Sequence, residues 1–254
     1  MPDGRTLILQ SQRLPLPQPW LRDCLDSVRR WAASAGHDYR FIGDELFDPL
    51  DEELRHKTRK QPVVASDLAR LRWLQRFRSQ GAVRVVWIDA DVLIFDPERF
   101  CLPDGSCAVG REVWIDRDRK DRLKAWRKLH NAFLYFGPGD SLLDFYADSA
   151  ERLLRAVDGP VSPQFIGPKL LTALHSLSRF PVLEEAAMFS PMLLRDLLGE
   201  ESARGALELF LKHCDAAPAA ANLCSSSVRS GALDNRQMAR AIERLLLDPR
   251  LKRR

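Results

Sequence analysis

The sequence has few cysteines and no long apolar run, and both scarcities restrict the class of protein. Its 254 residues include five cysteines, an odd number with no Cys-x-x-Cys spacing. This argues against a zinc site or a disulfide scaffold and for reduced thiols in a cytosol. No stretch reaches the length of a transmembrane helix, and the N-terminus lacks a signal-peptide pattern. We therefore expect a cytoplasmic protein, with peripheral contact to the inner face of the membrane left open.

A large excess of one charge is also missing. The net charge is +4 with 29% charged residues, which does not indicate a nucleic-acid-binding protein. No internal repeat or linker divides the chain, and 45% hydrophobic residues can form a sizeable core. We expect a single domain over residues 1–254. Within 213–254, the Ala-, Ser- and Pro-rich stretch 216–230 predicts a mobile segment that could close over a ligand.

The most informative stretch is an apolar, β-branched run from residue 83 to 95, interrupted by Asp89 and Asp91. Such a run is typical of a strand buried on both faces. Two carboxylates two residues apart on an extended chain point to the same side, so their repulsion and burial call for a cation. Mg²⁺ or Mn²⁺ takes oxygen ligands and leaves positions open for phosphate. We predict a metal–diphosphate site here. Ordinary turn carboxylates fit less well, because the apolar run continues to Phe95.

The order of the other elements predicts an α/β fold. A strand at 6–10, a helix at 20–35 and a strand at 39–42 indicate a parallel sheet, in which ligands gather beyond the carboxyl ends of the strands. Gln10, at such an end, is a candidate for contacting a nucleotide base, although a plain surface loop is an equal alternative. Further helices are expected at 65–80, 142–156 and 235–247, strands at 83–95, 107–114, 131–136 and 208–213, a strand pair at 181–191, and a charged helix or excursion at 115–129.

The helix at 65–80 carries Asp67 and Arg70 on or beside its apolar stripe. The two residues are one turn apart and could form a structural ion pair. Alternatively, they face the same cleft as the carboxylates of the following strand.

These motifs carry a family resemblance. Ser66-Asp67-Leu68-Ala69-Arg70, followed by a strand with Asp89-Ala90-Asp91, resembles the DxD glycosyltransferases with the GT-A (Rossmann-like) fold. This group includes the initiating α-1,6-mannosyltransferase of yeast, bacterial capsule transferases and the clostridial glucosylating toxins. The resemblance implies a mixed, mainly parallel sheet flanked by helices. It also implies metal-dependent transfer from a nucleotide sugar with retention of configuration, as in polysaccharide biosynthesis.

The resemblance implies roles for single residues. Asp67 and Arg70 would contact the sugar and ribose, Asp89 the ribose and a water-linked metal, and Asp91 the metal directly. These four are the catalytic candidates. Asn131, which resembles the Asn of an Asn-Ala-apolar strand, would face the donor. Two further candidates are Gly167, in a segment resembling Gly-Pro-x-x-Leu-Thr near the sugar, and His213, as a metal or diphosphate ligand.

The sequence therefore predicts a hexosyltransferase that uses Mn²⁺ or Mg²⁺ and a UDP- or GDP-sugar. The acceptor could be a carbohydrate, a lipid-linked molecule or a protein. One alternative is a Mg²⁺-dependent phosphohydrolase of the haloacid dehalogenase type, in which the first Asp of D-x-D is the nucleophile. That motif normally lies near the start of the chain, and no later acidic pair is evident here. Another alternative is a nucleotide-sugar-binding module without turnover.

Overall fold

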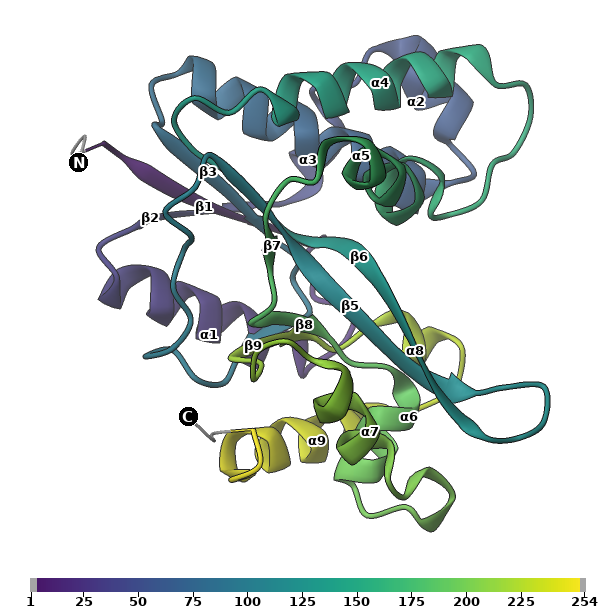
Figure 1. The fold of residues 1–254 in the computed structure, drawn as a ribbon. Helices are drawn as coiled ribbons and strands as arrows, with labels where there is room; N and C mark the ends of the chain where they lie inside the picture. Colours follow the sequence, from purple (N-terminus) through teal and green to yellow (C-terminus); the bar gives the residue numbers. More distant parts are fainter. Residues whose placement is uncertain (1–3, 252–254) are drawn as a thin grey trace.

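A computed structural model describes residues 4–251 and contains two sheets (Figure 1). The larger has six strands in the order β2-β1-β3-β6-β5-β7, and the smaller has the order β4-β9-β8. The strands are β1 Thr6–Ser11, β2 Asp38–Ile42, β3 Arg84–Ile88, β4 Val92–Ile94, β5 Cys107–Arg117, β6 Leu123–Phe136, β7 Val182–Leu183, β8 Ala186–Met188 and β9 Ala220–Asn222.

Helices cover both faces of the larger sheet (Figure 1). In that view α2, α3, α4 and α5 lie above the sheet, and α1, α6, α7 and α9 lie below it. The helices are α1 Leu21–Ser34, α2 Glu52–Thr58, α3 Pro62–Ser79, α4 Leu142–Ala156, α5 Leu170–Ser178, α6 Pro191–Leu197, α7 Ala206–His213, α8 Ser226–Arg229 and α9 Asn235–Leu247. Short 3-10 turns occupy Asp44–Phe47 and Glu201–Ala203, and an irregular helical turn occupies Phe165–Lys169.

The predicted mixed α/β architecture is confirmed. β1 pairs in parallel with β2 and β3, β5 pairs in parallel with β7, and β6 runs antiparallel to its two neighbours. The strands β1 and β3 are almost entirely buried because helices pack on both of their faces. The carboxyl ends of β1, β2 and β3 therefore meet at one edge of the sheet, and this edge positions the candidate site.

The apolar run from residue 83 to 95 is two strands and not one. β3 ends at Ile88, and the chain turns through Asp89, Ala90 and Asp91 before β4 begins in the smaller sheet. The turn is closed by a hydrogen bond from the Val92 N–H to the Asp89 carbonyl, 3.0 Å. The two carboxylates thus lie at a junction between two sheets.

Of the two alternatives for residues 115–129 the helix is wrong and the excursion is right, and the strand expected at 208–213 is wrong. Residues 115–129 belong to a long β5–β6 hairpin and form no helix, because Trp114 pairs with Trp126 and Ile115 with Ala125 across it. Residues 208–213 lie in helix α7, in which Ala206, Leu207 and Phe210 form one buried face at helical spacing.

Two other features of the described residues bear on the sequence-based expectations. All five cysteines are free thiols. Within residues 4–251, no helix combines the length and the apolar character that crossing a membrane requires.

Candidate functional site

Asp89 stands directly after the carboxyl end of β3, where main-chain contacts hold it. Its N–H donates to the Ala132 carbonyl of β6, 2.8 Å, and its own carbonyl accepts a hydrogen bond from the Gln10 side chain, 3.2 Å. The Trp87 indole N–H donates to Asp89 Oδ1 at 2.7 Å. The carboxylate is therefore oriented in advance, and its other oxygen accepts no hydrogen bond from the described residues.

Arg70 links two of the predicted carboxylates. Its guanidinium lies 3.1 Å from Asp67 Oδ1 and 3.1 Å from Asp89 Oδ1. It also donates to the Asn131 carbonyl at 2.7 Å and lies over the Trp87 ring, 5.3 Å from its centroid. The Arg70 side chain is only 8% exposed, so these contacts fix a desolvated charge in one orientation. Asp67 and Arg70 thus form an ion pair, and Arg70 also contacts Asp89 in the turn formed by residues 89–91, the carboxylate turn. Both alternatives left open by the sequence, a structural ion pair and a shared cleft, are therefore present.

Asp67 is held from its other side by Asn131 and Gly167. The Asn131 amide donates to Asp67 Oδ1 at 2.8 Å. A Cβ at Gly167 would lie 2.3 Å from Asp67 Oδ2, so only glycine allows this backbone to approach so closely. Burial raises the pKa of Asp67 to about 6, while Arg70 and the hydrogen bond from Asn131 oppose that rise.

Asp91 is bound by two residues of the stretch 216–230, for which the sequence predicted a mobile segment but no partner for a carboxylate. The Asn222 amide donates to Asp91 Oδ1 at 2.5 Å, and the Ser225 N–H donates to Oδ2 at 2.8 Å. Burial, followed by repulsion from Asp89, raises the pKa of Asp91. Between these partners, Cys224 adopts a left-handed backbone with φ of 51°, a conformation that is costly for a residue other than glycine. The only signal in the sequence was a lone Asn within an Ala-rich stretch.

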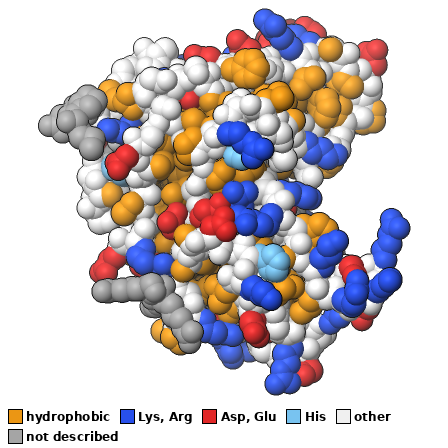
Figure 2. Space-filling view, in the orientation of Figure 1, with side chains coloured by type: hydrophobic (Ala, Val, Ile, Leu, Met, Phe, Trp, Pro, Cys, Tyr) orange, Lys and Arg blue, Asp and Glu red, His pale blue; other side chains and the backbone are white. Residues whose placement is uncertain are grey.

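Two cavities meet at these residues. One of about 380 Å³ extends over the carboxyl ends of β1 and β2 and includes Ser11, Asp44 and Phe47 in its lining. The other, about 710 Å³, extends along β5 and β6 towards α8. Both are lined by Val63, Arg70, Asp89, Asp91 and Ser225. Figure 2 shows the molecule hollowed at its right-hand edge, between the helices above the sheet and those below it.

Three predicted residues, Gly167, Gln10 and His213, lie outside the lining of both cavities. Gly167 packs against Asp67. Gln10 is completely buried, donates to the Asp89 carbonyl and accepts from the Tyr39 hydroxyl, so it supports the carboxylate turn from behind. Its neighbour Ser11 faces the smaller cavity instead. His213 ends helix α7, with Nδ1 2.9 Å from the Leu209 carbonyl. Because the chain is helical here and returns to the site only as β9, Asn222 and not His213 lies beside Asp91.

The donor set for a metal therefore consists of Asp89 and Asp91. Asn222 orients Asp91 through its NH2 group, and its own oxygen accepts a hydrogen bond from the Cys224 N–H. Among residues 4–251, no three His, Cys, Asp or Glu side chains come together as a metal-binding group. A Mg²⁺ or Mn²⁺ site needs fewer protein ligands than that, because one or two carboxylates, water and substrate phosphates complete its coordination. The residues present fit such an ion.

Comparison with known proteins gives a likeness of fold. No family model and no curated protein matches the sequence. Among solved structures, a glycosyltransferase involved in glycosylation of the major capsid of PBCV-1 superposes with a TM-score of 0.50. The two share 11% identity over 94% of this chain and 99% of that one. The galactosyltransferase LgtC, bound to donor and acceptor sugar analogues, gives 0.41 at 12% identity over 96% and 97% of the two chains. The glycosyltransferase GlyE of Streptococcus pneumoniae gives 0.44 at 11% identity over 97% and 61%. The chain thus has the GT-A fold that its motifs predicted.

Proposed function

We propose that this protein is a metal-dependent glycosyltransferase, which moves a sugar from a nucleotide-sugar donor to an acceptor hydroxyl with retention of configuration. One observation carries the proposal. Asp67, Asp89 and Asp91 meet a single internal cation, Arg70, where the two cavities join. This buried cluster holds an excess of negative charge, which a divalent cation would neutralise before an anionic diphosphate could approach.

Each of the two cavities would hold a different part of the proposed donor. The smaller cavity, at the carboxyl ends of β1 to β3, would take the nucleoside, with Phe47 against the base. The junction would take the diphosphate. The sugar would then lie in the larger cavity, where Asp67 and Asn131 reach the lining from α3 and β6. Gly167, packed against both, would hold these two side chains in place and not contact the donor directly.

The chain's own residues suit the charge changes of glycosyl transfer. As the bond between the anomeric carbon and the phosphate oxygen breaks, negative charge develops on the leaving diphosphate, and a new bond forms to the acceptor oxygen. A divalent ion held by Asp89 and Asp91 would supply Lewis-acid stabilisation of that charge. Arg70 is fixed beside this position, and its orientation needs no reorganisation during the reaction.

Thermal-shift titration tests the proposal directly. UDP-sugars and GDP-sugars are added with and without Mn²⁺, since a ligand that binds only the folded state raises the melting temperature. We expect one class of donor to stabilise the protein, with most of the shift dependent on the metal, and slow release of the nucleoside diphosphate. If no nucleotide sugar stabilises the protein in either condition, the proposal is wrong. Release of inorganic phosphate instead would favour the phosphohydrolase.

The matched variants are Asp91→Asn and Asp196→Asn. Asp91→Asn keeps the shape of the side chain but removes a metal ligand, so the Mn²⁺-dependent shift is expected to disappear while the fold remains. Asp196 accepts a hydrogen bond from the Leu207 N–H and lines neither cavity. Its variant should keep the shift. Unchanged Mn²⁺ dependence in Asp91→Asn would remove Asp91 from the metal site.

A further inference from the structure

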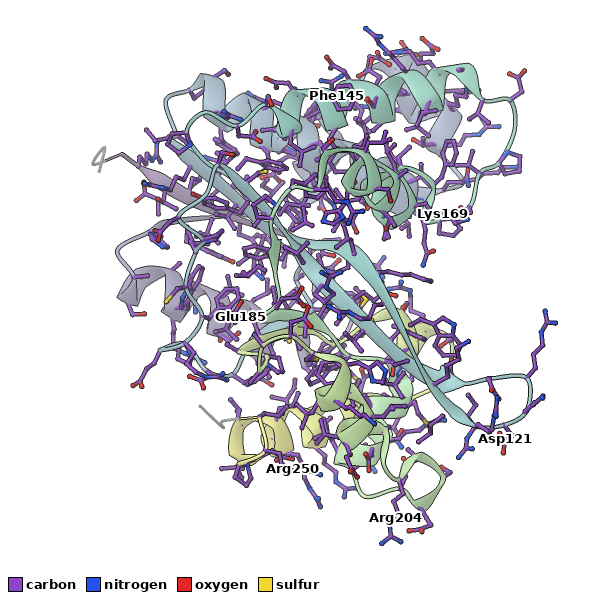
Figure 3. All side chains as sticks on the ribbon, viewed as in Figure 1. Asp121, Phe145, Lys169, Glu185, Arg204 and Arg250 are labelled. Atoms are coloured by element: carbon purple, nitrogen blue, oxygen red, sulfur yellow. The ribbon has the colours of Figure 1, made fainter. Side chains whose placement is uncertain are left out.

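The larger cavity has a part that the proposed donor does not occupy. Its wall there is formed by Glu112 and Trp114 on β5 and by Lys128 on β6. This wall belongs to the long β5–β6 hairpin, whose tip at Asp121 is marked in Figure 3. Lys169, on the opposite side of the hollow, is marked in the same view. No residue of this wall has a role in the proposed donor site.

The alternation of β5 directs these side chains into the cavity. Val113 and Ile115 are buried and pack with the helices below the sheet, so Glu112 and Trp114 point the other way. Across the hairpin, Glu112 pairs with Lys128 and Trp114 with Trp126. Directly opposed residues of an antiparallel pair share one face, and a carboxylate and an indole therefore stand side by side along the cavity.

Glu112 has no partner within the described protein. It is only 6% exposed, yet none of residues 4–251 gives its carboxylate a hydrogen bond or an ion pair within 4 Å. Burial raises the pKa of Glu112, and Lys128 opposes the rise without forming a salt bridge. A carboxylate that burial desolvates and that no protein donor compensates costs free energy, and only the cavity that it lines gives donors access to it. Such a cost is typical of a group whose donors arrive with a ligand.

Trp114 complements the carboxylate. It is partly buried in the cavity wall, and its indole N–H donates to none of the described residues. An indole offers a flat apolar face together with one polar edge. A pyranose ring has the matching chemistry, with an apolar C–H face and a rim of hydroxyl donors. A lipid tail would need an apolar wall, but Glu112, Lys128 and Gln164 all face this space.

We propose that this wall is the acceptor subsite and that the acceptor is a carbohydrate, whose ring stacks on Trp114 and whose hydroxyl donates a hydrogen bond to Glu112. This inference rests on the proposed function and names the substrate class that it leaves open. The wall shares its cavity with Asp91 and Asn131, so a sugar bound there would present a hydroxyl towards the sugar of the donor.

Ligand-observed saturation-transfer NMR tests the subsite without turnover. The protein of residues 1–254 is saturated with the diamagnetic ion Mg²⁺ and with UDP or GDP, whichever stabilises it. Methyl glycosides of the common hexoses and their disaccharides are then added at millimolar concentration. We expect transfer to the ring protons of at least one glycoside. No transfer to any of them would overturn the proposal, and so would transfer to a Ser- or Thr-containing peptide alone.

Three variants locate the binding. Trp114→Ala should abolish the saturation transfer, and Glu112→Gln should weaken glycoside binding about tenfold, the effect of one charge-assisted hydrogen bond. Trp126→Ala removes a similar ring from the opposite strand, where it lines neither cavity, and should keep the signal. Equal loss in all three variants, or in none of them, would overturn the assignment of the wall.

Melting temperature separates binding from structure. Because Glu112 is buried and unpaired, Glu112→Gln should leave the melting temperature unchanged or raise it. A clear decrease would show that the carboxylate stabilises the fold, which contradicts the proposal. The metal-dependent nucleotide shift should be the same in all three variants and in the parent. If a variant loses glycoside binding but keeps the nucleotide-dependent rise in melting temperature, the effect is confined to the acceptor subsite. If it loses both, the result counts against the proposed function.

Discussion

At the scale of single residues, the candidate site carries charge that the fold alone does not need. Asp67 shows this clearly. Its burial outweighs its ion pair with Arg70, so its pKa lies at about 6 and not at the ordinary 3.8. A group that the folded state protonates more readily than the unfolded state destabilises the fold once it ionises. The free energy of unfolding attributable to Asp67 therefore falls as the pH rises from about 4 to about 6 and stays low above that range.

Asp67→Asn should remove the destabilisation that the ionised Asp67 causes. Above pH 6 the variant is expected to be more stable than the parent by up to about 3 kcal/mol, the equivalent of the pKa difference. Arg70 keeps Asp89 as a partner, and sugar transfer should fall sharply. Urea unfolding of both proteins between pH 4 and pH 8 gives the difference as a function of pH. A variant that is less stable than the parent at pH 8 would show that Asp67 is a structural ion-pair residue.

Gly167 provides a residue-scale test of positioning. An alanine methyl at this position would come within 2.3 Å of Asp67 Oδ2 and 2.8 Å of the Asn131 amide. Asp67 is pinned between Arg70 and Asn131, so it can move only by breaking one of these contacts. We expect Gly167→Ala to lower kcat/KM for transfer by about 100-fold, since small displacements at a reacting centre are costly.

The matched control is Gly105→Ala. A Cβ at Gly105 would meet only ordinary contacts, at 3.9 Å from Cys107 and Pro181, and both rate and melting temperature should be unchanged. If Gly167→Ala transferred sugar at the parental rate, Asp67 could not be a precisely placed contact to the donor.

At the scale of elements, long segments with one buried stripe could be predicted from the sequence, and short or two-sided ones could not. Helices α1, α4 and α9 each present apolar residues at helical spacing, and the predicted ranges agree closely with the observed ones. The hairpin over β5 and β6 was missed because its distal half carries many charges and only a few scattered apolar residues, such as Ile115 and Ala125, meet the core. Helix α7 was missed because Leu207, Leu209 and Leu211 imitate the alternation of a strand.

The residues of the candidate site also fall into those that the sequence could predict and those that it could not. Asp67, Arg70, Asp89 and Asp91 could be predicted because each interrupts an apolar pattern and would be costly without a purpose. Asn222 and Ser225 could not, because Asn222 ends a strand of only three residues, and the contacts of both residues with Asp91 span more than a hundred residues of sequence. Glu112 was passed over because a single charge in a strand is usually solvated.

The segment after β9 is the element for which we predict ligand-dependent order. Residues 219–223 are completely or almost completely buried and include the central strand of the smaller sheet. The prediction of a mobile segment at 216–230 is therefore replaced by one for residues 224–231, which follow this strand. These residues hold the strained Cys224 and the four-residue helix α8, and Ser225 and Arg229 line the larger cavity.

Hydrogen exchange measures this order. With nucleotide sugar and Mn²⁺, we expect the amides of 224–231 to exchange more slowly, because a donor bound beside Asp91 would favour the hydrogen bond from Ser225. The buried amides of 219–223 should be protected in both states and serve as the internal control. Identical exchange of 224–231 with and without a donor that demonstrably binds would exclude closure by this segment.

At the scale of the whole molecule, the two sheets are interlaced and do not form separate domains. β3 of the larger sheet runs into β4 of the smaller one through the carboxylate turn, and β4 pairs with β9 from the C-terminal part of the chain. One buried cluster joins Trp20 and Leu21, near the start of α1, to helices α6, α7 and α9. No position in the described chain separates two independent cores, which supports the proposal of a single domain over 1–254.

A single domain of this kind should unfold in one step. We expect far-ultraviolet and near-ultraviolet circular dichroism to report the same transition, and both should move together when nucleotide sugar and Mn²⁺ are added. At a hundred times the dissociation constant, the ligand would add about 2.7 kcal/mol to the free energy of unfolding. Removing every residue after His213 deletes β9 and the partners of Asp91. The truncated chain should therefore fail to fold as a whole. Two separate transitions in the full chain, or a truncated chain that still folds and binds the nucleotide, would show that residues 1–213 form a domain of their own.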